Sequence, residues 1–408
     1  MSRTHFVVRG ALLLGALGGL YGCDTGANVL SPRVVDDLFR NYVAIGNSIT
    51  AGFQSDGIND STQAQSYALL IARQMGTRFA FAALAKPGCR PPIANFQTQA
   101  RVGGGTSTTC AFRTPASATY ALNNVAVPGI TTFDPTLNGG APGYTQNSNP
   151  LMQIILGGKT MVQKALEVQP TFATVWVGNN DVLQPAITGF PSTATPQATF
   201  QANYDKMISE LTTGAPGIKG VLIGVVQVAN APILFTSQAL RNPAFVAGLT
   251  QAAGLPPGGL TIDPTTCTAT NTSLIGFPII AQIAAKTLPP VIACAKTANP
   301  PVGDIFVLDA AEQVQAKGII DAYNAYIKTK ADAIGFGFYD PNVTLARVTP
   351  LDPVLSTHVP NLASATATFG NYISLDGVHP NAAAHVEIAK DLIAVINAKY
   401  STKIPAIP

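Results

Sequence analysis

Short apolar runs alternate with segments of helical periodicity along most of this chain, and this alternation limits the folds open to it. The expected strands are residues 42–45, 172–177, 220–228, 305–309 and 335–339. The expected helices are residues 66–74, 160–168, 204–212, 319–334 and 381–400. In the last segment, Ala389, Leu392 and Ile396 recur at the spacing of one helix face. Alternating strands and helices form a mostly parallel sheet covered on both faces, so we expect a three-layer α/β/α sandwich.

The N-terminus has the pattern of an export signal. Arg3 and Arg9 precede an apolar run at residues 11–20, which is too short to span a bilayer. Gly22 and Cys23 follow and resemble a bacterial lipobox, in which the cysteine is lipidated and becomes the new N-terminus. The sequence therefore predicts a lipid-anchored protein of the bacterial cell envelope, with cleavage nearby and no lipid as the alternative.

Four cysteines remain after Cys23, and an even number in an exported protein favours two disulfides. Of the three pairings that the order allows, we favour Cys89–Cys110 and Cys267–Cys294, because each would close a local loop. No cysteine or histidine pair has the spacing of metal ligands, so neither a metal nor a cofactor is expected.

Composition favours an enzyme with a large core. Hydrophobic residues make up 47% of the chain and charged residues 11%, with a formal net charge of +3. Lysine and arginine are scattered, whereas nucleic-acid binding requires a concentrated basic surface, so no nucleic-acid partner is expected.

Four short segments carry the residue types that acyl transfer needs. A serine hydroxyl requires a base to remove its proton, and the tetrahedral intermediate requires hydrogen-bond donors for its oxyanion. Ser48 could be the nucleophile, and Asp376 could orient His379 as the base, because they stand three residues apart in one turn. The segments are Gly46-Asn47-Ser48-Ile49-Thr50, Asn124-Val125-Ala126-Val127-Pro128-Gly129, Gly178-Asn179-Asn180-Asp181 and Asp376-Gly377-Val378-His379.

In this order the segments resemble the four blocks of the SGNH, or GDSL-type, hydrolases. The resemblance runs from Ser48 to His379 and implies a serine esterase. It assigns the oxyanion hole to the N–H groups of Ser48 and Gly129 and to the side-chain amide of Asn180. One residue departs from the family pattern: Asn47 stands where these hydrolases usually have aspartate, a position that is mainly structural in the family.

Each of these residues also has an ordinary structural interpretation. Taken alone, Ser48 would be a helix N-cap or turn serine, Gly129 a Pro-Gly turn and Asn180 a strand-end cap. Among the other histidines, His5 belongs to the leader, His385 should lie on a partly buried face of the final helix, and His358 should lie in a surface loop. Asp181 is expected to brace its own loop.

The domain organisation expected from the sequence is one hydrolase domain with two insertions. The boundaries are residues 1–22 for the signal peptide, 23–40 for a tether, 41–400 for the hydrolase domain and 401–408 for a tail, with insertions at about 86–120 and 237–300. We expect the insertions to form a loop-rich cap over the site, each closed by a disulfide; packing inserts that never meet substrate are the alternative.

The predicted activity is hydrolysis of a carboxylic ester of lipid, short-acyl or acylated-glycan type. Two alternatives stay open: a non-catalytic envelope lipoprotein that binds glycan or protein, and an acyltransferase that resolves the same intermediate with an alcohol. The membrane is an expected partner through the lipid at Cys23. The sequence does not indicate the oligomeric state.

Overall fold

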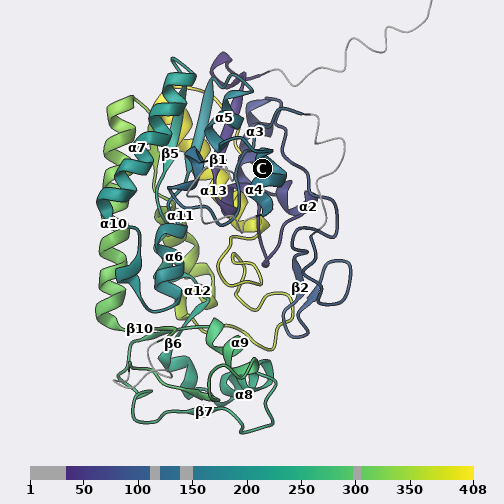
Figure 1. Ribbon diagram of the computed structural model, residues 1–408, viewed down its shortest axis with the longest axis vertical. Coiled ribbons are helices and arrows are strands. Elements are labelled where there is room, and N and C mark those ends of the chain that lie inside the picture. Colours follow the sequence, from purple (N-terminus) through teal and green to yellow (C-terminus); the bar gives the residue numbers. More distant parts are fainter. Residues whose placement is uncertain (1–33, 111–119, 138–149, 297–304) are drawn as a thin grey trace, which may run out of the picture. The chain divides into compact units, whose positions relative to one another are not determined.

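The computed structural model describes residues 34–110, 120–137, 150–296 and 305–408. At its centre lies a four-stranded sheet in the order β1-β4-β5-β11 (Figure 1). All of its pairings are parallel, with Tyr42 opposite Phe172 and Gly46 opposite Trp176 at the two ends of the β1–β4 pair. Beyond β1, the sheet continues through single parallel bridges that Asn124 makes with Ala44 and Phe81. The strands are β1 (Tyr42–Gly46), β4 (Phe172–Trp176), β5 (Lys219–Ile223) and β11 (Gly337–Tyr339).

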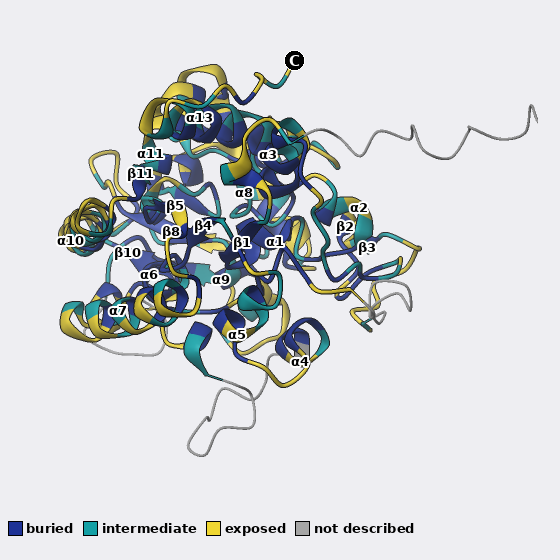
Figure 2. Cartoon of the chain, turned by 90° about the horizontal axis from the view of Figure 1, so that it is seen from above, coloured by how far each residue is buried: buried dark blue, intermediate teal, exposed yellow. Residues whose placement is uncertain are grey.

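Helices cover both faces of this sheet, as Figure 2 shows in a view from above. On one face α5 (Met161–Leu166), α7 (Gln197–Gly214) and α10 (Ala310–Ile334) bury their apolar sides against alternate strand residues such as Val43 and Val175. On the other face α3 (Tyr67–Met75) and α13 (Ala382–Tyr400) pack against the intervening residues. The predicted α/β/α sandwich with a parallel central sheet is thus confirmed.

The described residues also form shorter α-helices. They are α1 (Ser48–Ala51), α2 (Asp60–Gln63), α4 (Pro150–Leu156), α6 (Asn180–Ile187), α11 (Pro341–Val348) and α12 (Pro353–Thr357). None of the described helices is long and apolar enough to cross a membrane.

Three expected elements differ clearly in length. The helix expected at 204–212 extends as α7 from Gln197 to Gly214, and the other two differ for local reasons. The strand at 220–228 ends at Ile223, because the next N–H groups bond to side chains: Val225 donates to Asn324 and Val226 to Asn179. The long helix begins at Ala310 rather than residue 319. Its start is set by a capping box in which Asp309 and Glu312 exchange side-chain and backbone hydrogen bonds of 2.9 and 3.0 Å.

The strand expected at 305–309 does not belong to the central sheet. Only β10 (Val307–Leu308) forms there, and it pairs antiparallel with β8 (Leu274–Gly276), which pairs in turn with β6 (Leu234–Thr236). The reason is burial, because Leu308 packs in a separate apolar core with residues of the second insertion.

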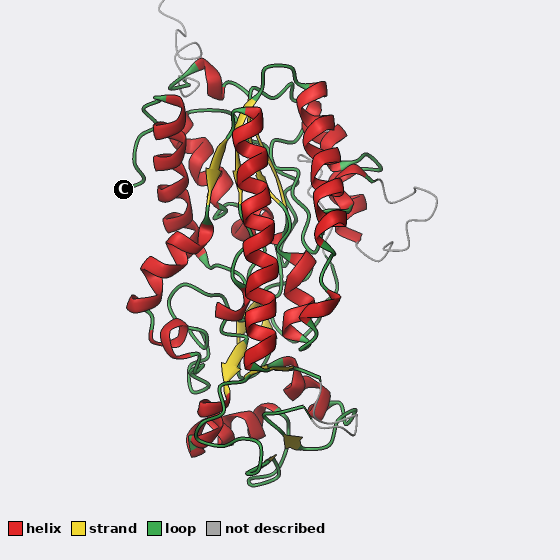
Figure 3. Ribbon diagram, turned by 90° about the vertical axis from the view of Figure 1, so that its left-hand side faces the viewer, coloured by secondary structure: helices red, strands yellow, loops and turns green. Residues whose placement is uncertain are grey.

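This second insertion is a small subdomain beyond the carboxyl edge of the central sheet (Figures 1 and 3). It adds α8 (Pro243–Ala252) and α9 (Pro278–Ala284), and a short parallel pair of β7 (Thr261–Ile262) with β9 (Val291–Ile292). The first insertion contributes the antiparallel pair β2 (Ile93–Asn95) and β3 (Ala100–Arg101). Both expected disulfides, Cys89–Cys110 and Cys267–Cys294, are present.

Candidate active site

Ser48 lies at the point where β1 turns into α1. Asn47 caps this helix, since its side-chain oxygen accepts the Ile49 N–H at 3.1 Å. Residue 46, which precedes Asn47, must be glycine, because a Cβ on Gly46 would lie 2.1 Å from the Thr50 hydroxyl oxygen. Ser48 is thereby the first residue of a helix, where backbone N–H groups have no intrahelical partner. The capping bond also shows how asparagine keeps the structural role of the aspartate usual in the family.

The side chains of Ser48, His379 and Asp376 form one hydrogen-bonded chain. The Ser48 Oγ lies 2.8 Å from Nε2 of His379, and Nδ1 of the same ring lies 2.9 Å from Oδ2 of Asp376. The three residues come from the end of β1 and from the loop before α13. The ring of Phe53 lies 4.9 Å from that of His379 and limits its movement from one side.

The Asp376 carboxylate is held in its charged form. Burial alone would raise its pKa, but the charge and hydrogen bond of His379 and the N–H groups of His379 and Asp56 outweigh burial and lower the pKa to about 2. The three backbone donors are Val378 and His379 on Oδ1 at 2.9 Å and Asp56 on Oδ2 at 2.8 Å. A fixed carboxylate behind Nδ1 selects the tautomer whose Nε2 can accept a proton from Ser48.

Sequence reasoning missed the part that residues 53–56 play. Besides the Asp56 N–H, Ser55 exchanges hydrogen bonds with the Asp376 loop: its N–H donates to Ser374 Oγ at 2.7 Å, and its own Oγ accepts from Leu375 N–H at 3.2 Å. Each contact joins a backbone N–H to a side-chain oxygen of a residue far away in the sequence. The sequence carries no local signal for such a pairing.

Asn180 and Gly129 lie on two segments joined by hydrogen bonds. Asn180 is the first residue of α6, and its Nδ2 donates to the carbonyl of Ile130 at 2.6 Å. An amide nitrogen carries two hydrogens, so a second donor remains for a ligand. Gly129 has a φ of +83°, a conformation that favours glycine.

Asp181 joins the same two segments, whereas the sequence suggested that it would brace its own loop. Its carboxylate accepts the Thr132 N–H at 2.9 Å and the Thr132 hydroxyl at 2.7 Å. Burial raises the pKa of Asp181 to about 6, although the bonds from Thr132 and Thr195 act in the opposite direction.

The other described histidines make different contacts. His385 is fully buried rather than partly buried as expected; its Nδ1 accepts the Tyr67 N–H at 3.2 Å. Burial, together with the charge of His379, lowers the pKa of His385 to about 3, so its ring is neutral at ordinary pH. His358 is half-buried and places Nδ1 3.0 Å from the carbonyl of Leu234. Neither ring contacts Ser48, whereas His379 does.

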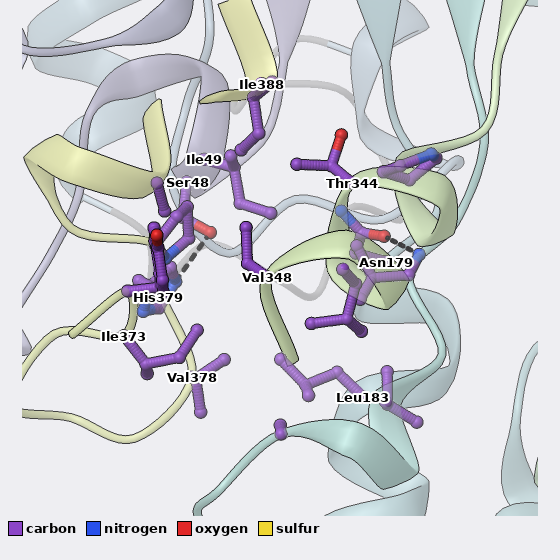
Figure 4. Close-up of a pocket in the computed structure, with 18 of the residues that line it drawn as sticks. Ser48, Ile49, Asn179, Leu183, Thr344, Val348, Ile373, Val378, His379 and Ile388 are labelled. Atoms are coloured by element: carbon purple, nitrogen blue, oxygen red, sulfur yellow. Dashed lines mark hydrogen bonds between the residues drawn. The ribbon is translucent and has the colours of Figure 1, made fainter. Parts of the chain in front are cut away.

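Two cavities adjoin His379. The first lies between α1, α6, α11 and α13, and its walls are almost wholly apolar; Figure 4 shows Ser48 and His379 on one side and Val348 and Leu183 on others. The second is larger and lies between the main sheet's edge and the two insertions, with Arg90 and Phe96 from the first and Gln251 and Phe277 from the second. Both insertions therefore face the site.

No cluster of metal-ligating side chains occurs within residues 34–110, 120–137, 150–296 and 305–408. The expected signal peptide and the candidate lipidation site Cys23 lie outside the described residues.

The fold and the site define a class: an α/β/α protein with a serine–histidine–aspartate constellation at the carboxyl edge of its sheet. The model of the family GDSL-like Lipase/Acylhydrolase matches residues 42–392. The chain belongs to this family, which makes it an ester hydrolase in general terms.

The matches among solved structures include a carbohydrate esterase and a lipase. One is an active-site mutant of a family two carbohydrate esterase from Clostridium thermocellum, with 13% identity and a TM-score of 0.36; the match covers 90% of this chain and 65% of that one. The other is an extracellular lipase from Streptomyces rimosus, with 15% identity and a TM-score of 0.37; the match covers 88% of this chain and 98% of that one. The chain thus spans about two thirds of the Clostridium protein's length. No match was found among curated proteins.

Proposed function

We propose that this protein is a serine-dependent carboxylic ester hydrolase that acts through an acyl-enzyme intermediate. Ser48 is the nucleophile, His379 the general base and Asp376 the carboxylate that orients it. The observation that carries the proposal is the continuous chain from Ser48 Oγ to His379 Nε2 at 2.8 Å and from His379 Nδ1 to Asp376 at 2.9 Å.

In the first half of the reaction, Ser48 Oγ attacks the ester carbonyl carbon while His379 Nε2 takes the hydroxyl proton. The tetrahedral intermediate collapses, the bond to the alcohol oxygen breaks, and His379 returns the proton to the departing alcohol. In the second half a water molecule repeats the attack on the acyl-Ser48 carbonyl with His379 again as base. The products are the free acid and the restored Ser48 hydroxyl.

The oxyanion hole in this proposal consists of the Ser48 N–H, the Gly129 N–H and the Asn180 amide. Three features support it: Ser48 begins a helix, Gly129 adopts a positive φ after Pro128, and the Asn180 amide has one hydrogen beyond its bond to Ile130. Such donors act on the charge that develops in the transition state, and removing one typically costs about 3 kcal/mol.

The test is hydrolysis of p-nitrophenyl acetate, butyrate and octanoate by the wild type beside a folded Ser48→Ala variant. We expect hydrolysis by the wild type, and a loss of kcat by a factor of about 10⁴ or more in the variant. Equal activity of the two proteins would refute Ser48 as the nucleophile. Adding an alcohol acceptor and analysing the products separates hydrolysis from acyl transfer.

We also propose that the protein is exported and anchored in the bacterial envelope through a lipid on Cys23. The proposal follows from the basic and apolar leader and from the Gly22-Cys23 pair. Labelling with a radioactive fatty acid in the native host should mark the wild type and not a Cys23→Ser variant. Equal labelling of both would refute the site.

A further inference from the structure

The two cavities share His379, whereas Ser48, Asn180 and Asp376 each line only one of them and Gly129 lines neither. Ser48 and Asn180 line the first cavity and not the second. Asp376 and Phe53 line the second and not the first. Val378 and Leu183 join His379 as walls of both. The imidazole of His379 therefore lines both cavities, with Ser48 in the wall of one and Asp376 in the wall of the other.

We propose that a bound ester is divided between these cavities, with its acyl chain in the first and its alcohol in the second. This inference rests on the proposed function, because it uses the direction of proton transfer. The carbonyl carbon must lie against Ser48 Oγ, and the departing oxygen must lie near His379 Nε2, which protonates it. The acyl group accordingly extends on the side of Ser48 and the alcohol leaves past His379 toward the insertions.

The chemistry of the first cavity suits an unbranched acyl chain. Its walls are formed by side chains such as Ile49, Val228, Val348, Ile373 and Ile388, with hardly any polar surface exposed. In Figure 4 Val348 projects toward the space beside Ser48 and Ile49. Each methylene buried there should raise kcat/KM about fourfold, so kcat/KM should increase with acyl length until the cavity is filled.

The chemistry of the second cavity suits an alcohol of saccharide type, which has apolar ring faces and several hydroxyl groups. Phe96 and Phe277 line this cavity half-buried, and the buried Phe369 packs edge-on against both; the three ring centroids lie 5.4 to 5.9 Å apart. Aromatic rings of this kind provide apolar surfaces for ring faces.

Amide side chains line the same cavity as these rings: Gln184 from α6, Gln251 from the second insertion, and Gln97 and Gln99 from the first. The amide nitrogens of Gln97 and Gln99 already donate to backbone carbonyls, so their oxygens and the amides of Gln184 and Gln251 are the groups offered to a ligand. Amides both donate and accept hydrogen bonds, as hydroxyl groups require. Asp56 and Arg90, which form an ion pair at 2.9 Å, add a charged pair to the wall nearest Asp376.

Two variants test the division, one for each cavity. Val348→Phe adds volume to the first cavity, and Ala281→Trp adds volume to the second from an exposed position on α9. The acyl series is p-nitrophenyl acetate, butyrate and octanoate, in which the alcohol is constant. The alcohol series is the butyrate esters of methanol, 1-octanol and methyl glucoside, in which the acyl group is constant.

We expect Val348→Phe to lower the octanoate-to-acetate ratio of kcat/KM about tenfold and to leave the ratios of the alcohol series unchanged. Ala281→Trp should lower kcat/KM for methyl glucoside butyrate relative to methyl butyrate about tenfold and leave the acyl series unchanged. The wild type should prefer the glucoside ester to both other alcohols. Because Val348 is buried, Val348→Ala serves as the second variant at this position and should shift the preference toward octanoate.

Each outcome bears on the inference separately from the catalytic proposal. Inactivity of the wild type on every ester, or full activity of Ser48→Ala, would refute the proposed function. If hydrolysis depends on Ser48 but Val348→Phe changes the alcohol series, or Ala281→Trp the acyl series, the division is wrong. A preference for 1-octyl butyrate over the glucoside ester would refute the saccharide class.

Discussion

His379 places its Nε2 2.8 Å from the Oγ of Ser48, although the two residues stand 331 positions apart in the chain. The serine belongs to the turn after β1, and the histidine belongs to a loop that hydrogen bonds from Ser55 and Asp56 hold against that turn. The distance between the two catalytic atoms therefore depends on this junction as well as on the residues themselves.

Asp376→Asn should lower kcat by a factor of about 10³ to 10⁴, with a smaller change in KM. The amide removes the negative charge behind His379 and can donate to Nδ1, which favours the tautomer that cannot accept the Ser48 proton. Steady-state kinetics on p-nitrophenyl butyrate measure the effect, and near-ultraviolet circular dichroism checks the fold. A kcat within tenfold of the wild type would contradict the role of Asp376.

Asn180→Ala should lower kcat by a factor of about 10² to 10³, because it removes one donor to the oxyanion. The bond from Nδ2 to Ile130 is lost as well, so thermal unfolding must accompany the kinetics. The matched control is Asn179→Ala, since Asn179 lies next to it and its oxygen accepts the Val226 N–H on the other side. An equal loss of kcat in both variants would argue against a specific oxyanion role for Asn180.

His385→Gln should keep kcat within about threefold, whereas His379→Gln should lose a factor of about 10³ or more. His385 accepts the Tyr67 N–H through Nδ1, and a glutamine oxygen can take over that bond. A large loss of kcat in His385→Gln with an intact fold would show that the buried ring takes part in catalysis.

The same residue should make folding sensitive to acid. Its pKa in the folded protein, about 3, lies below the unfolded value of 6.5, so the unfolded chain binds the extra proton. The contribution of the neutral His385 to the free energy of unfolding is therefore complete above about pH 6.5 and decreases as the pH falls toward 3. Urea unfolding of the wild type and His385→Gln across this range should show a steeper acid loss in the wild type. Parallel curves would contradict it.

Asp181 should have the opposite effect on stability. Its folded pKa of about 6 lies above the unfolded value of 3.8, so the folded state holds the proton more tightly. The stabilisation is complete below about pH 4 and is lost as the pH rises through 6, by at most about 3 kcal/mol. We expect the wild type to lose stability relative to Asp181→Asn between these values in urea unfolding. The variant also changes the contacts with Thr132, which shifts its free energy of unfolding by the same amount at every pH. If the difference in free energy of unfolding between the two proteins did not vary with pH, the prediction would be contradicted.

Replacing Cys267 and Cys294 together by serine should lower the free energy of unfolding by about 3.5 kcal/mol in the chain-entropy model. The two residues are 27 positions apart and buried in the core of the second insertion. Because both are buried, a mild reductant should leave this disulfide intact in the native protein. Urea unfolding and thiol counting test these points, and rapid reduction under native conditions would contradict them.

Much of this architecture follows from the sequence because its signals are local. Periodicity predicts which segments form strands and helices, and a parallel sheet then brings Ser48 and Asn180 to the same edge. The disulfides were predictable for the same reason, since each closes a short loop. The resemblance of the four segments to the blocks of a known family singled out Ser48, Asp376 and His379, and the structure brings these three residues into one hydrogen-bonded chain.

The tertiary structure alone decided what depends on packing between distant segments. Residues 305–309 lie outside the central sheet because the core of the second insertion buries Leu308. The periodicity of the sequence does not encode this contact. The support of Asp376 by the Asp56 backbone and the full burial of His385 have the same origin. The two cavities are lined by residues from distant parts of the chain, so their shape depends on the fold. The sequence by itself determined the elements and the chemical groups; packing of those elements determined their distances, their pKa values and the spaces between them.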